Sequence, residues 1–374
     1  MRTSFSGFVG SLLLVSAVAA VAADLPADRF GPADLARLAA VGESAFAPDG
    51  ESIVYTVTVT NAAEDKQQSD LWRVGYDGGD RLQLTNTPKS DEWAPAWSPD
   101  GRWLAFLADR GDDDAQTQVW AMPAGGGEAR VLTNLPGGVD DFQWSPDSRR
   151  LAVIASDPER PAGTPKPKNP PPIVTERWQF KKDVDGYLDA RRSHLYVHDV
   201  ARSESMQITF GDHDEALPAW SPDGRQIAYI TRRGGEPDRH SNFDIYLVEP
   251  RAGATERRLT TFDGADNDPD LGSPISWSPD GRQLAFVQGG EDKWIYYAPH
   301  QLAIVDVATG RTRVPALIDR WFTQPRWSPD GRSVLALIEQ SRVINLSRIE
   351  VASGKVTPLT TGLRYDAGFA LSKQ

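Results

Sequence analysis

A short motif, Trp-Ser-Pro-Asp-Gly, constrains this chain more than any other feature, because close versions of it occur six times. Its aromatic positions are residues 46, 97, 144, 220, 277 and 327, so successive copies lie 51, 47, 76, 57 and 50 residues apart. A period of this length is typical of repeat architectures and not of one continuous core.

Each copy of the motif predicts a tight turn between two strands. Proline presets the backbone for the second turn position, aspartate bonds its own backbone, and glycine tolerates a positive φ. The runs that follow, such as 103–108 and 118–122, are apolar or alternate with polar residues over five to eight positions, as strands do. Units of about 50 residues with four strands each predict an all-β fold, a β-propeller.

The phase of the repeat predicts six recognisable blades and the start of another. Blades begin near residues 46, 97, 144, 220, 277 and 327, within a propeller spanning 45–374. Ala370-Leu371-Ser372 lies in the Ala-Trp-Ser phase, 44 residues after Trp327, so we expect the opening strand of a truncated seventh blade near 371. The alternative is that residues 24–45 supply the missing strands. The segment before the first repeat, 24–44, which we call the lead-in, has the pattern of a short helix at 32–40 and not that of strands.

The first 23 residues predict a secretory signal peptide. Arg2 gives a positive start, 8–21 is an apolar run, and cleavage is expected near Ala22 and Ala23. A transmembrane anchor is the alternative, but the apolar run is shorter than the roughly 20 residues that a spanning helix needs. We therefore expect a periplasmic or secreted protein with no membrane partner after cleavage.

Charge and composition exclude several other classes. Removal of Arg2 takes the formal net charge from −12 to −13, which argues against nucleic acid as a partner. The chain has no cysteine and so has neither a disulfide framework nor a thiolate metal site. We expect no cofactor.

The long interval between the third and fourth motifs predicts an insertion over residues 157–192. Its first part, 157–172, holds seven prolines and cannot pair inside a sheet. The insertion must therefore project from one face of the ring.

The repeats resemble those of two groups: the TolB-type propellers and the propeller domains of the prolyl oligopeptidase superfamily. The end of the insertion, Arg-Trp-Gln-Phe-Lys-Lys-Asp-Val-Asp-Gly-Tyr at 177–187, resembles the Arg-x-x-Tyr-Lys-x-Asp-Gly-x-Gly-Tyr segment of the acylaminoacyl-peptidase and dipeptidyl-peptidase-5 branch. Phe180 and Val184 depart from that pattern. The helical lead-in also resembles this branch, whereas a TolB-like protein would place an α/β domain before its repeats.

No catalytic residue is predicted in this chain. In the family that it resembles, a hydrolase domain follows the propeller and carries its nucleophile on a G-x-S-x-G turn. That motif is absent here, and the fragment at 42–46 lacks the second glycine. The resemblance implies a substrate-gating propeller of a secreted serine oligopeptidase, inactive alone, that acts on short peptides with a hydrolase domain. The alternative is a non-enzymatic, TolB-like periplasmic scaffold that binds proteins.

No metal site is predicted either. His194 and His198 lie four apart and share a strand face, where packing is the favoured interpretation. Asp263, Asp266, Asp268 and Asp270 form an acidic loop, but the spacing of a calcium loop is missing. We interpret this loop as a solvated turn.

Four residues of the insertion are candidates for substrate binding: Arg177, Lys181, Asp183 and Tyr187. The first three lie on one side of an extended segment, in a loop held by a rigid scaffold. The alternative, which we favour for the charged residues, is a structural salt bridge that pins the insertion to the propeller.

Five of the twelve tryptophans occupy the repeat position and predict packing between blades. Three others fall outside this phase and are candidates for a surface or channel role: Trp178, Trp294 and Trp321.

Overall fold

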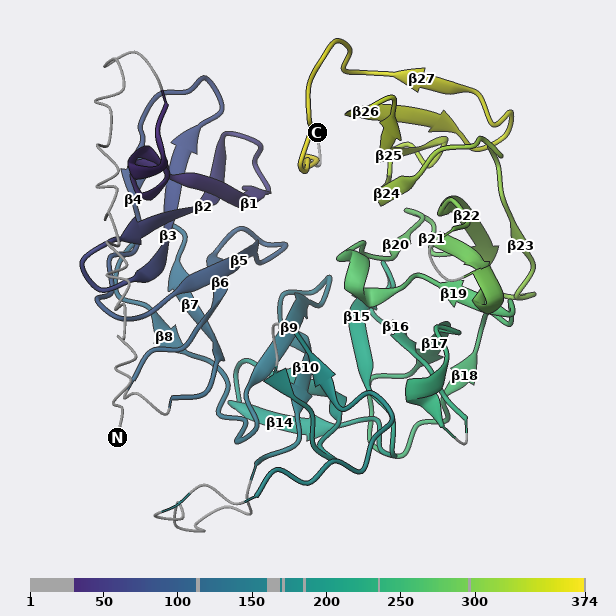
Figure 1. Ribbon diagram of the computed structural model, residues 1–374, viewed down its shortest axis with the longest axis horizontal. Coiled ribbons are helices and arrows are strands. Elements are labelled where there is room, and N and C mark those ends of the chain that lie inside the picture. The colour runs from purple at the N-terminus through teal and green to yellow at the C-terminus, as the bar shows by residue number, and fades with distance from the viewer. Residues whose placement is uncertain are drawn as a thin grey trace, which may run out of the picture.

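Six antiparallel sheets, five of four strands and one of five, stand around a central opening in the computed structural model (Figure 1), which confirms the predicted all-β, six-bladed propeller. The structure describes residues 30–111, 115–159, 169, 172–183, 186–234, 236–294 and 297–372. The predicted signal peptide lies outside these residues. Each blade runs outward from an innermost strand to a short outer one.

The first three blades come from the N-terminal half of the chain. Blade one has β1 (Ala40–Phe46), β2 (Ser52–Asn61), β3 (Lys66–Gly75) and β4 (Leu82–Gln83). Blade two has β5 (Glu92–Trp97), β6 (Trp103–Ala108), β7 (Gln118–Pro123) and β8 (Arg130–Val131). Blade three has β9 (Val139–Trp144), β10 (Arg150–Ser156), β13 (Ser193–Asp199) and β14 (Glu204–Gln207).

The last three blades follow in order around the ring. Blade four has β15 (Glu215–Trp220), β16 (Ile227–Thr231), β17 (Asp244–Val248) and β18 (Arg257–Arg258). Blade five has β19 (Gly264–Asp266), β20 (Ser276–Trp277), β21 (Gln283–Glu291), β22 (Gln301–Asp306) and β23 (Thr312–Arg313). Blade six has β24 (Phe322–Trp327), β25 (Ser333–Gln340), β26 (Val343–Glu350) and β27 (Val356–Pro358).

Short elements outside the blades connect or precede them. The expected N-terminal helix is a six-residue 3-10 helix, η1 (Pro32–Arg37), in which the carboxylate of Asp34 accepts the Gly31 N–H at 2.8 Å. Three further single turns of 3-10 helix are η2 (Pro237–Arg239), η3 (Pro269–Leu271) and η4 (Asp292–Trp294). The insertion between β10 and β13 contributes a small hairpin, β11 (Lys181–Lys182) and β12 (Gly186–Tyr187).

The Ser-Pro-Asp-Gly turn forms as its chemistry predicts. Ser98 Oγ donates to Asp100 Oδ1 at 2.6 Å and accepts the Trp103 N–H at 3.0 Å, while Gly101 has φ +72°. The same serine bridge recurs in four later blades, at residues 145, 221, 278 and 328. Each turn therefore satisfies its own buried backbone groups and joins the two inner strands of a blade.

The repeat tryptophans lie between blades, as predicted. All five belong to, or pack against, the apolar clusters that fill the spaces between neighbouring sheets. Three of their indoles also donate to carbonyls in the preceding blade: Trp144 to Ala96, Trp220 to Gln143, and Trp277 to Ala219, at 3.2, 3.2 and 3.0 Å. The repeat thus supplies both the core and the hydrogen bonds that link the blades.

The ring is open between its first and last blades. Within the described residues, strands at 40–83 form blade one and strands at 322–358 form blade six, and neither sheet takes a strand from the other end of the chain. Figure 1 shows the gap between these two blades. Of the segment 24–45, the described residues 30–45 do not supply missing strands, because β1 belongs to blade one itself.

The predicted opening strand of a seventh blade is not formed, which corrects the expectation for residues near 371. Tyr365 makes an isolated parallel bridge with Ile344, and the described residues after it belong to no strand. Asp366 accepts hydrogen bonds from the Thr360 hydroxyl and the Leu346 N–H. The segment is thus anchored to blade six through this side chain and through two backbone hydrogen bonds with Ile344, without the continuous ladder that a strand requires.

Candidate functional site

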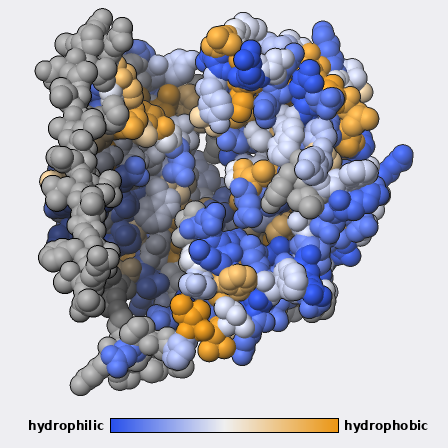
Figure 2. Space-filling view, viewed as in Figure 1, coloured by the Kyte–Doolittle hydropathy of each residue, from blue (hydrophilic) through white to orange (hydrophobic). Residues whose placement is uncertain are grey.

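A cavity of about 940 Å³ lies at the centre of the ring. All six blades contribute to its wall, and the described part of the insertion covers part of it. Figure 2 shows this face hollowed near its middle, with hydrophilic residues around much of the rim. Representative wall residues, one for each blade, are Glu43, Ala94, Asp141, Leu217, Pro274 and Arg326.

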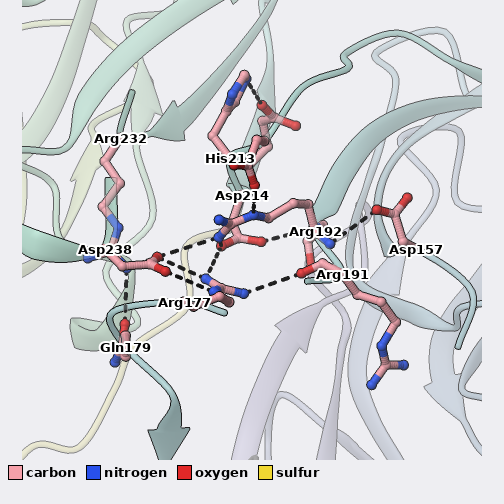
Figure 3. Close-up of polar contacts among 12 residues, drawn as sticks. Asp157, Arg177, Gln179, Arg191, Arg192, His213, Asp214, Arg232 and Asp238 are labelled. Carbon is pink, nitrogen blue, oxygen red and sulfur yellow. Dashed lines mark hydrogen bonds and ion pairs between the residues drawn. The ribbon is translucent and has the colours of Figure 1, made fainter. Parts of the chain in front are cut away.

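Arg177 ties the insertion to blade four (Figure 3). Its Nε donates to Asp238 Oδ2 at 2.8 Å, and its Nη2 donates to Asp238 Oδ1 at 2.9 Å and to Asp214 Oδ2 at 3.0 Å. A third group, Nη1, donates to the Arg191 carbonyl at 3.3 Å. The Arg177 side chain is only 8% exposed. This bidentate, buried geometry matches the structural salt bridge that we favoured from the sequence.

Two further guanidinium groups surround Asp238. Arg192 Nη1 lies 3.4 Å and Arg232 Nη2 lies 3.3 Å from Asp238 Oδ1. Burial alone would raise the pKa of Asp238, but the hydrogen bonds and charge of Arg177, with the charges of Arg192 and Arg232, hold that pKa below its ordinary value. The carboxylate stays ionised and acts as the common anchor of three segments.

The four predicted site residues have different surroundings. Arg177 and Tyr187 line the cavity, and Tyr187 is exposed. Lys181 and Asp183 are exposed and lie outside the wall, whereas the neighbouring Lys182 lines it and forms an exposed ion pair of 3.5 Å with Asp270. A role in substrate binding for the four candidates stays a prediction.

Sequence reasoning missed a buried carboxylate at the start of β15. Glu215 is almost fully buried, and it accepts the Thr209 hydroxyl at 2.7 Å while His194 Nδ1 lies 3.0 Å away. Its other oxygen lies 3.1 Å from His213 Nε2. Burial would lower the pKa of His194, but Glu215 raises it. This cluster joins blade three to blade four.

The histidines and the acidic loop hold no recognisable metal site. His198 Nδ1 lies 3.0 Å from the Ser205 hydroxyl, away from Glu215. Among the residues that the structure describes, no three histidine or acidic side chains are grouped as metal ligands would be. The solvated-turn interpretation is wrong for Asp266 and Asp268, which are buried. Burial raises the pKa of Asp266 to about 6, and its Oδ1 accepts Gln288 Nε2 at 2.7 Å.

The three tryptophans proposed for a surface or channel role, Trp178, Trp294 and Trp321, are not part of the cavity wall. Trp178 and Trp294 are exposed on the surface, and the Arg239 guanidinium lies 4.2 Å from the centre of the Trp178 ring. Trp321 stacks on His300, with 4.3 Å between the centroids of the two rings.

In the described part of the chain, no helix has the length and apolar character needed to span a bilayer.

Comparison with known proteins agrees with this architecture. Residues 187–370 match the family model PD40, described as the TolB β-propeller domain. Dipeptidyl-peptidase 5 of Porphyromonas gingivalis is 29% identical over 396 residues, which cover 98% of this chain and 54% of that protein. The chain therefore spans about half the length of this curated relative.

Solved structures share the fold at lower identity. Uncomplexed Pyrococcus horikoshii acylaminoacyl peptidase superposes with a TM-score of 0.68 and 18% identity, over 90% of this chain and 48% of that one. The β-propeller domain of the Trilobed protease from Pyrococcus furiosus, which has an open velcro topology, gives a TM-score of 0.61 and 17% identity over 90% and 88% of the two chains. The chain thus carries a PD40 β-propeller that is homologous to the aligned part of dipeptidyl-peptidase 5 and shares its fold with acylaminoacyl peptidase.

Proposed function

We propose that this chain is the substrate-gating propeller of a secreted or periplasmic serine oligopeptidase, and that it admits short peptides to a hydrolase domain. The observation that carries this proposal is the central cavity of about 940 Å³, whose wall combines all six blades with the anchored insertion. The relative that aligns with 98% of the chain is a dipeptidyl-peptidase, which supports peptides as the substrate class.

The dimensions and rigidity of the cavity suit a size filter. Ligand cavities of about 300–1,000 Å³ enclose small molecules, so a volume at the upper end suits a short peptide and excludes a folded domain. The buried pairing of Arg177 with Asp238 holds the insertion in place over the wall. A filter of this kind supplies selection, while the nucleophile and base come from the hydrolase domain.

Binding of peptides of graded length tests the proposal. We expect isothermal titration of the purified chain to detect extended peptides of a few residues but not a small folded protein. Tyr187→Ala, which widens the cavity, should change the length preference, whereas Tyr297→Ala, at a position that is 90% exposed and outside the wall, should not. Equal binding of short peptides and folded proteins would contradict gating. We also expect no hydrolysis of dipeptidyl reporter substrates by this chain alone.

A protein-binding scaffold is the second candidate, and one feature of the surface favours it. The insertion exposes four apolar side chains within eight residues: Ile173, Val174, Trp178 and Phe180. Exposed apolar clusters often mark interaction sites. Binding of a folded periplasmic protein that is lost on Trp178→Ala, together with no binding of short peptides, would support the scaffold instead.

A further inference from the structure

Among the described residues, the cavity wall carries three charged side chains that form no ion pair: Glu43, Asp141 and Arg326. Asp141 lies on β9 in blade three, and Arg326 lies on β24 in blade six. These strands face each other across the central opening in Figure 1. Among the described residues, neither side chain forms an ion pair, and the carboxylate of Asp141 accepts only the N–H of Phe142, at 2.7 Å.

Other charges in the same wall already have partners. Arg177 pairs with Asp214, Arg191 pairs with Asp189 at 2.8 Å, and Lys182 pairs with Asp270. These pairs leave little net charge for a ligand. The carboxylate of Asp141, with that of Glu43 near it, and the guanidinium of Arg326 therefore dominate the field that a ligand in the cavity would meet.

The two sides of the wall have opposite character. Burial, with the nearby carboxylates of Asp140 and Glu43, raises the pKa of Asp141 to about 7. Water in the cavity reaches Arg326, but the protein around it displaces bulk solvent, and this burial lowers the pKa of the guanidinium. Both groups are shifted toward their neutral forms because each lacks a counter-charge, so a ligand that brings the missing charges would be stabilised at both.

We propose that the cavity holds a short peptide with free ends at two points, with its α-ammonium group at Asp141 and its α-carboxylate at Arg326. This proposal rests on the proposed gating function and names the ligand groups that the gate recognises. A guanidinium fork pairs well with a carboxylate, and a carboxylate accepts from an ammonium group. A polyanion would be repelled by Asp141, Asp140 and Glu43, and a polycation would be repelled by Arg326. Only a ligand with opposite charges at its two ends matches both sides.

Blocked peptides provide the test. Isothermal titration of the whole chain would compare trialanine with free ends, its N-acetyl form, its C-amide and the doubly blocked peptide. A charged hydrogen bond contributes enough that each block should weaken binding to the unmodified protein about tenfold. Asp141→Asn should remove the effect of acetylation only, and Arg326→Gln should remove the effect of amidation only. Arg191→Gln, which alters a paired residue of the same wall, should leave both effects in place.

The outcomes separate this proposal from the gating function. If all four peptides bind equally, the two-point site is wrong and gating stands. If none of them binds to the folded chain, both proposals fail. Asp141→Glu keeps the charge and should keep the sensitivity to acetylation, and circular dichroism would establish that each variant is folded. Affinity for the free-ended peptide should also rise between pH 6 and pH 8 as Asp141 loses its proton, and this rise should be absent in Asp141→Asn.

Discussion

Loss of Asp238 should destabilise the propeller more than loss of its main partner, Arg177. The two side chains are 5% and 8% exposed. In Arg177→Ala, Asp238 keeps Arg192 and Arg232 within 3.4 Å, so the cost is about 1–3 kcal/mol of unfolding free energy, that of lost charged hydrogen bonds. In Asp238→Ala, Arg177 and Arg192 keep only partly exposed carboxylates such as Asp214, and Arg232 loses its ion pair. Breaking such a buried set costs about 3–5 kcal/mol.

Calorimetry and proteolysis would measure this difference. At roughly 2–4 °C per kcal/mol, Asp238→Ala should lower Tm by about 10 °C and Arg177→Ala by about 5 °C. Arg177→Ala should also expose the insertion at 172–191 to limited proteolysis before the blades are cut. Arg251→Ala, at an exposed ion pair with Glu249, is the matched control and should change Tm little.

The pH dependence adds a second check on the same carboxylate. The pKa of Asp238 is lower in the folded protein than in an unfolded chain. Its contribution to stability is therefore fully present above the unfolded value of about 4 and is lost as pH falls through the lower, folded value. An equal or larger loss of stability in Arg177→Ala than in Asp238→Ala at pH 7 would refute the assignment of Asp238 as the common anchor.

Three further predictions concern other parts of the ring. Ser221→Ala removes a buried hydroxyl that bridges its turn and should cost about 1–2 kcal/mol in urea unfolding. Lys182→Ala breaks an exposed ion pair with Asp270 and should change unfolding free energy by about 0.5 kcal/mol or less, a result that a loss above 2 kcal/mol would contradict. Asp266→Asn should stabilise the protein by about 2 kcal/mol at pH 7, because burial raises the pKa of Asp266 to about 6. The unmodified protein should then lose stability as pH rises from roughly 4 to 6, and urea unfolding of Asp266→Asn should lack this slope.

Local chemistry explains why the blades were predictable from the sequence. The serine and aspartate of each turn bond to groups within five residues, so the motif determines its own geometry. The aromatic residue just before the turn then packs between blades wherever the turn recurs. Long-range pairs carry no such signal: Arg177 lies 61 residues from Asp238 and 37 from Asp214, and nothing in the sequence pairs them.

Glu215, which sequence reasoning missed, and Asp266, which it interpreted as solvated, occupy equivalent positions in their repeats. Glu215 and Asp266 begin or lie within the first strand of their blades, close after a threonine whose hydroxyl accepts the N–H of a neighbouring strand. The acidic loop is buried for this reason. Asp366 bonds to Thr360 as Glu215 bonds to Thr209, so the phase of the repeat extends to residue 366. The strand expected after residue 366 is absent because the repeated sequence determines only hydrogen bonds between nearby residues. A strand also needs a neighbouring strand to pair with.

The repeat also indicates where function is encoded in this scaffold. Every blade must fill the same spaces with the same turn and aromatic residue, so those positions cannot distinguish one blade from another. The position three residues before the aromatic residue varies in charge, size and polarity around the ring, and in the first five blades it lines the cavity: Glu43, Ala94, Asp141, Leu217, Pro274 and, in blade six, Gln324. Because charged residues at this position lie only in blades one and three, the asymmetry of the cavity arises from differences between repeats. Substitutions of the two charged residues, Glu43 and Asp141, should alter ligand preference with little effect on the fold.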